Sequence, residues 1–85
     1  ALLRSERASY AKDERIVLRY DDMSDKLAAT ICYQVKGKGA YQVAKEISKA
    51  EGVVEIDGLA SGEYSFYVCL DGQPISPACN VKVER

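Results

Sequence analysis

The stretch Ser61–Pro77, SGEYSFYVCLDGQPISP, decides the fold of this chain. Its first half alternates, and one face of the predicted strand carries the apolar residues Tyr64, Phe66, Val68 and Leu70. Asp71-Gly72 follows and is typical of a two-residue hairpin turn, because both central residues of such a turn need a positive φ. Pro74 and Pro77 then interrupt the returning strand, since proline cannot donate a hydrogen bond to a neighbouring strand.

The turn also predicts a register. With Asp71 and Gly72 as the loop, the facing pairs are Leu70–Gln73, Cys69–Pro74, Val68–Ile75 and Phe66–Pro77. Val68 and Ile75 then meet on the inner face, whereas Cys69 lies on the outer face. In the last strand, the apolar residues are expected to face inward; they are Ile75, Cys79, Val81 and Val83.

Three further stretches alternate between apolar and polar residues in the manner of strands. They lie at residues 15–20, 29–36 and 53–56, and turn-forming residues separate them. Residues 41–47 fit a strand but also fit a short helix, and the surrounding strands favour the strand.

The first part of the chain has a different character. Residues 1–14 are rich in charge and contain no β-branched residue. We expect a flexible arm or linker here, with a short helix or an irregular first strand as the alternatives. The chain is therefore divided into an arm at 1–14 and one small domain at 15–85.

About six or seven short strands, separated by regular turns and without a long helix, predict an all-β, antiparallel β-sandwich. The corner before Tyr64 contributes to this prediction. Gly62 lets the chain turn sharply, and Leu59 is expected to plug the end of the sandwich. Tyr64 is expected to bury its ring while its hydroxyl reaches a backbone group of the corner.

Residues 51–84 resemble the C-terminal half of a filamin-type immunoglobulin-like repeat. Those repeats end in a pattern similar to Gly-x-Tyr-x-x-x-Val, a short turn, Ile followed by Ser-Pro, and alternating valines. The matching residues are Gly62, Tyr64, Val68, Ile75, Ser76, Pro77, Val81 and Val83. The corner residues Leu59, Gly62 and Tyr64 are similar to those of fibronectin type III domains as well. The resemblance implies an immunoglobulin-like sandwich that serves as an interaction or spacer module of a larger protein.

The chain has three cysteines, Cys32, Cys69 and Cys79, and none belongs to a Cys-x-x-Cys pair. An odd count leaves at least one free thiol, which favours a reducing, intracellular compartment. Tyr67-Val68-Cys69 also resembles the Tyr-x-Cys of immunoglobulin domains. That resemblance implies an alternative, an extracellular adhesion or receptor domain with a Cys32–Cys69 disulfide. The absence of tryptophan counts against this bridge.

Composition excludes several kinds of function. There is no histidine, which excludes His-based triads and most mixed-ligand zinc sites and leaves Cys69 without a histidine to activate it. With 12 basic and 13 acidic residues the net charge is −1, which gives no electrostatic footprint for nucleic acid. No apolar run is long enough to cross a bilayer. We therefore expect no catalysis, cofactor, metal, nucleic-acid binding or membrane insertion.

We expect a non-catalytic module that binds a protein or peptide and adjoins other domains of its parent chain. In filamin-type repeats a partner peptide adds as a strand to an exposed sheet edge, and by resemblance residues 41–47 are that edge here. The candidate partner-binding residues are Tyr41, Val43, Ile47 and Tyr67. A further alternative is an accessory carbohydrate-binding module of an enzyme, which the lack of tryptophan disfavours.

Overall fold

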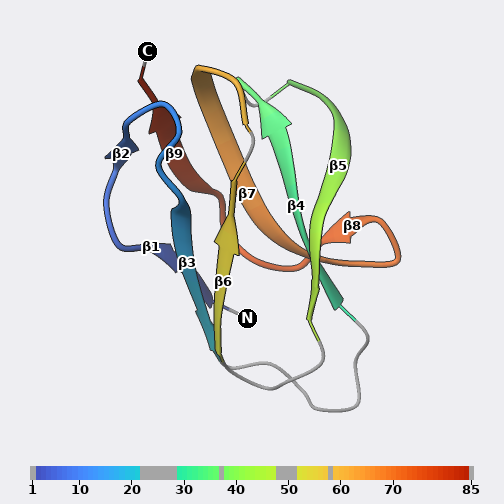
Figure 1. The fold of residues 1–85 in the computed structure, drawn as a ribbon. Coiled ribbons are helices and arrows are strands. Elements are labelled where there is room, and N and C mark those ends of the chain that lie inside the picture. Colours follow the sequence, from blue (N-terminus) through green and yellow to red (C-terminus); the bar gives the residue numbers. More distant parts are fainter. Residues whose placement is uncertain (1, 22–28, 37, 48–51, 58, 85) are drawn as a thin grey trace.

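The computed structural model describes residues 2–21, 29–36, 38–47, 52–57 and 59–84. These residues form two β-sheets that pack face to face, as predicted, and none of them is helical (Figure 1). Within the same residues there is accordingly no helix that could span a membrane.

Nine strands are described, against the six or seven expected. They are β1 (Leu2–Ser5), β2 (Ser9–Tyr10), β3 (Ile16–Asp21), β4 (Ala29–Val35), β5 (Lys38–Ile47), β6 (Gly52–Ile56), β7 (Gly62–Leu70), β8 (Gln73–Pro74) and β9 (Cys79–Val83). The smaller sheet has the order β1-β3-β6, and the larger has the order β2-β9-β7-β4-β5, with β8 paired to β7. The described strand pairs are antiparallel except for β2 with β9, which are parallel, so the larger sheet is mixed.

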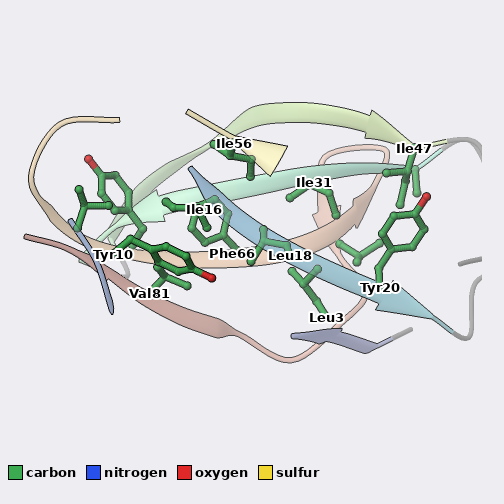
Figure 2. Close-up of a cluster of buried hydrophobic side chains, with 14 residues drawn as sticks. Leu3, Tyr10, Ile16, Leu18, Tyr20, Ile31, Ile47, Ile56, Phe66 and Val81 are labelled. Atoms are coloured by element: carbon green, nitrogen blue, oxygen red, sulfur yellow. The ribbon is translucent and has the colours of Figure 1, made fainter. Parts of the chain in front are cut away.

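The core lies between the two sheets and follows the alternation in the sequence (Figure 2). In β3, Ile16 and Leu18 face the core and are fully buried. Arg19, which points to the opposite face of the strand, is exposed. The larger sheet contributes the buried residues Ile31, Phe66, Val68, Val81 and Val83. Burying this apolar surface is the main source of stability in so small a domain.

The N-terminal segment corrects the expectation of a flexible or short helical arm. β1 pairs with β3 and β2 pairs with β9, so the chain passes from one sheet to the other between Ser5 and Ser9. Leu3 and Tyr10 are buried in the core. The irregular strand, one of the alternatives, is what forms here, because pairing with the edges of β3 and β9 outweighs the weak strand propensity of the segment.

Tyr10 fixes β2 through several contacts. Its hydroxyl donates to the carbonyl of Val17 at 3.3 Å and accepts from the backbone N–H of Arg7 at 3.1 Å. The guanidinium of Arg7 lies 4.7 Å from the centre of the Tyr10 ring and pairs with Glu14. The hydrogen bond from the N–H of Ala11 lowers the pKa of the Glu14 carboxyl, and the bond from Arg7 adds to this shift.

The β7–β8 hairpin confirms the predicted turn and its first two pairs. Asp71 and Gly72 have φ values of 51° and 78°, and the facing pairs are Leu70–Gln73 and Cys69–Pro74. Beyond Pro74 the prediction is wrong in detail. Phe66 faces Cys79 instead of Pro77, and the Ile75 side chain is 39% exposed instead of inward.

The proline-rich return explains this difference. Pro74 and Pro77 lack backbone donors, and residues 75–78 leave the regular ladder before β9 begins at Cys79. The hydroxyl of Ser76 takes over a ladder bond by accepting from the N–H of Val68 at 2.8 Å. The Ile75 N–H still donates to the Val68 carbonyl at 2.7 Å.

The corner before β7 forms as predicted. The hydroxyl of Tyr64 donates to the carbonyl of Ala60, and the Tyr64 ring is buried. Leu59 is half-buried against the core, as a residue that closes the end of the sandwich must be. Burial raises the pKa of the Tyr64 phenol, and the neighbouring Tyr33 adds to the rise.

Replacing Tyr64 separates the two contributions of the corner. Tyr64→Phe removes the hydrogen bond to Ala60 and is expected to lower the free energy of unfolding by about 1 kcal/mol. Tyr64→Ala also leaves a cavity and should cost about 3 kcal/mol or more. Urea unfolding followed by circular dichroism measures both values. Equal losses for the two variants would show that the ring contributes nothing.

The N-terminal strands are tested by comparing a buried tyrosine with an exposed one. Tyr10→Ala should lower the free energy of unfolding by about 3 kcal/mol, because a buried aromatic ring and its hydrogen bonds are lost. Tyr41→Ala, at an exposed site, should cost less than about 1 kcal/mol. If urea unfolding gave the two variants the same stability, β2 would not belong to the cooperative fold.

Candidate interaction surface

β5 is an edge strand of the larger sheet. Among the described strands it is hydrogen-bonded to β4 alone, and residues 41–47 are therefore a strand, as favoured, and not a helix. The side chains of Lys38 through Val43 are all exposed. An edge strand of this kind offers a row of backbone N–H and C=O groups to an incoming strand.

The pairing of β5 with β4 is irregular at two places. Ile31 faces Lys45 while the next residue, Cys32, faces Val43, so Ala44 is an extra residue in β5. A second irregularity lies between residues 38 and 42. Bulges of this type twist an edge and hinder edge-to-edge pairing with another sheet.

Three of the four predicted partner-binding residues lie together on the outer face of the larger sheet. Val43 and Tyr67 flank Cys32 on the two neighbouring strands. The rings of Tyr41 and Tyr67 meet edge to face, with centroids 5.4 Å apart. Val43 is 63% exposed. We name Tyr41, Val43 and Tyr67 the outer patch.

Ile47 does not share this surface. Its side chain is 6% exposed and belongs to the core. Ala44 explains why: in a regular strand Val43 and Ile47 lie on the same face, but the extra residue between them reverses the alternation. The sequence predicts that the Ile47 side chain contacts a partner. In the structure it packs in the core instead and contributes to stability.

A groove lies beside Lys45 of β5. It has a volume of about 600 Å³ and lies between β5 and β6, the edge strands of the two sheets. Its lining residues are Arg15, Lys45, Val53, Val54, Glu55 and Asp57. Arg15 lies 2.9 Å from Glu55 and 3.8 Å from Asp57, so the groove carries both signs of charge beside exposed valine.

Sequence patterns did not reveal this groove. Its residues come from β5, from β6 and from the segments that flank β3 and β6. Only the strand order places the edges of the two sheets next to each other. An exposed valine at position 53, on the outer side of a predicted strand, is the one signal that the sequence contains.

Two buried thiols lie on the same face of the larger sheet as the outer patch. Cys69 faces the outer side of the sheet, as predicted, yet it is 0% exposed, and Cys32 is 2% exposed. Cross-strand partners share a face, so Cys69 is flanked by Thr30 of β4 and by Pro74 of β8. This flanking explains why an outward residue is inaccessible.

The environment of Cys69 disfavours the thiolate form of its side chain. Burial raises the pKa of Cys69 to about 12, and a hydrogen bond with Cys32 adds to the rise. The described cysteines, Cys32, Cys69 and Cys79, carry no disulfide bond. Among the described residues no three acidic or cysteine side chains cluster in a way that could hold a metal ion.

Thiol titration tests this arrangement. In the native protein one thiol, the half-buried Cys79, should react quickly with Ellman's reagent, and all three should react in denaturant. Cys69 should react far more slowly, because its raised pKa lowers the thiolate fraction about a thousandfold at neutral pH. Cys79→Ser should remove the fast phase. Three equally fast thiols in the native state would contradict the burial.

Comparisons of the chain with protein-family models, with curated proteins and with solved structures gave no match. Its function is therefore argued from the edge of β5, the outer patch and the groove between β5 and β6.

Proposed function

We propose that this chain is a non-catalytic interaction module that binds an extended segment of a partner protein as an added strand on β5. The observation that carries the proposal is the position of β5 at the end of the larger sheet, with its side chains exposed from Lys38 to Val43. Backbone hydrogen bonds along such an edge supply affinity, and alternate side chains of the partner supply specificity.

Both faces of an added strand would find contacts beside β5. On one side lies the outer patch, where Val43 and the Tyr41–Tyr67 pair offer apolar and aromatic surface. On the other side lies the groove, with Arg15, Glu55 and Asp57. We expect a partner segment whose outer side chains are apolar or aromatic and whose groove-facing side chains are charged or polar.

The proposal includes an immunoglobulin-like assignment of the filamin or fibronectin type. Two features support it. The strand orders β1-β3-β6 and β9-β7-β4-β5 match the orders A-B-E and G-F-C-C′ of immunoglobulin-like sandwiches. The hydrogen bond from Tyr64 to Ala60 lies at the start of the strand equivalent to F, where immunoglobulin domains have their tyrosine corner.

Selection of peptides from a random library displayed on phage tests the binding site. Peptides that bind the wild-type domain should bind Val43→Lys at least about tenfold more weakly, which corresponds to about 1.4 kcal/mol. The matched control is Ile75→Lys, which changes another exposed apolar residue outside the outer patch and should bind as the wild type does. Both variants should keep wild-type stability within about 0.5 kcal/mol, because both sites are exposed.

Amide hydrogen exchange locates the contact independently of these variants. A bound peptide should slow exchange in residues 38–47, because an added strand accepts hydrogen bonds from the free edge of β5. Slower exchange in β1 or β2 with none in β5, or equal binding to the two lysine variants, would exclude strand addition at this edge.

A further inference from the structure

Cys32 and Cys69 are diagonal neighbours on the same face of β4 and β7. Cys69 faces Thr30 across the β4–β7 ladder, and Cys32 is two residues further along β4 on the same face. The Cys32 sulfur lies 3.3 Å from the Thr30 hydroxyl, so the side chain leans along β4 toward the position opposite Cys69. Both side chains are buried, whereas Cys79 lies on β9 against the inner core.

We propose that Cys32 and Cys69 are a conditional disulfide site, which a low-molecular-weight disulfide oxidises when the outer face opens. The bond would tie β4 to β7 on the same face as the outer patch, with Val43 and Tyr67 on either side of Cys32. This inference concerns the thiols alone and does not depend on the binding of a partner to β5.

The pairing of β4 and β7 disfavours a bond between these two thiols in the undistorted sheet. Diagonal neighbours on antiparallel strands have Cα atoms about 7–8 Å apart, just beyond the range of about 4.4–6.8 Å that disulfides span. Because β4 and β7 are already paired, closing the bond requires a local shift of Cys32 along β4 toward Cys69. A disulfide formed under such strain is readily reduced again, which is the property of a reversible site rather than of a structural bridge.

The oxidation proceeds by two thiol–disulfide exchanges. A protein thiolate attacks one sulfur of the oxidant and releases one small thiolate, which leaves a mixed disulfide on the protein. The second protein thiol then loses its proton and attacks the protein-bound sulfur, and the other small thiolate leaves. Two protein thiols are oxidised, one oxidant disulfide is reduced to two thiols, and the two protons go to these products.

Burial sets the rate of the first exchange. In the closed state the oxidant cannot reach either sulfur, since both are covered. Tyr67, which faces Cys32 across the β4–β7 ladder, is a large outward side chain next to that thiol, and its hydroxyl donates to Gln34 at 3.4 Å. Removing its ring should expose Cys32, the thiol that the oxidant can then attack first, and speed oxidation several-fold.

Oxidation by glutathione disulfide tests the site in a Cys79→Ser background, which leaves only the two thiols of the pair. The protein is incubated with the oxidant in sub-denaturing urea, which promotes opening, and then analysed by mass spectrometry and peptide mapping. We expect loss of two hydrogen atoms and a cross-linked peptide that joins Cys32 to Cys69. Adding Tyr67→Ala should raise the rate several-fold.

Two matched variants, Cys32→Ser and Cys69→Ser in the same background, provide the control. Each should stop at the mixed disulfide with glutathione. If the Cys79→Ser protein also stopped at mixed disulfides, or stayed reduced in urea while denatured protein reacts, the two cysteines would not be a disulfide site. An unchanged rate in the Tyr67→Ala variant would overturn the role of Tyr67 as cover.

Discussion

The ladder between β4 and β7 is the interaction on which the rest of the structure depends. The two strands pair without interruption from Thr30–Cys69 to Val35–Tyr64. Because side chains alternate across a strand, this register sends Phe66 into the core and the next residue, Tyr67, to the outer face. A slip of one residue would exchange the two sets of side chains. The core and the outer patch are thus two consequences of one strand pairing.

Local chemistry explains which parts of the fold could be predicted from the sequence. The hairpin was predictable because Asp71 and Gly72 adopt positive φ within the turn itself. The alternation of β3 and β7 was predictable because one face of each is buried. β1 and β2 were not predictable from their own residues. They form because the edges of β3 and β9 pair with them and because Tyr10 packs in the core.

The candidate site could be predicted only in part. The alternation placed Tyr67 on the outer face, but only the pairing of β5 and β7 with β4 brings Tyr41 and Val43 to that same face. The alternation failed for Ile47 because the bulge at Ala44 leaves no signature in the sequence. The groove depends on the order of strands in two different sheets. The alternation of β7 also predicted correctly that the Cys69 side chain faces outward. It could not predict that this side chain is buried, because the burial depends on flanking residues from other strands.

The irregular pairing of β5, which at Ala44 reverses the alternation of its side chains, also restricts what its free edge can accept. β5 pairs regularly with β4 from Lys45 to Ile47 and at Gln42–Val43, and the chain is irregular between these stretches. A strand that adds to the other side of β5 meets the same interruption, so a long flat strand, as in an aggregate, cannot pair along its whole length. A short partner can pair with one regular stretch and use its side chains for the outer patch and the groove. Because the irregular pairing limits how many backbone hydrogen bonds a partner can make with β5, side-chain contacts are expected to decide which partners the edge binds.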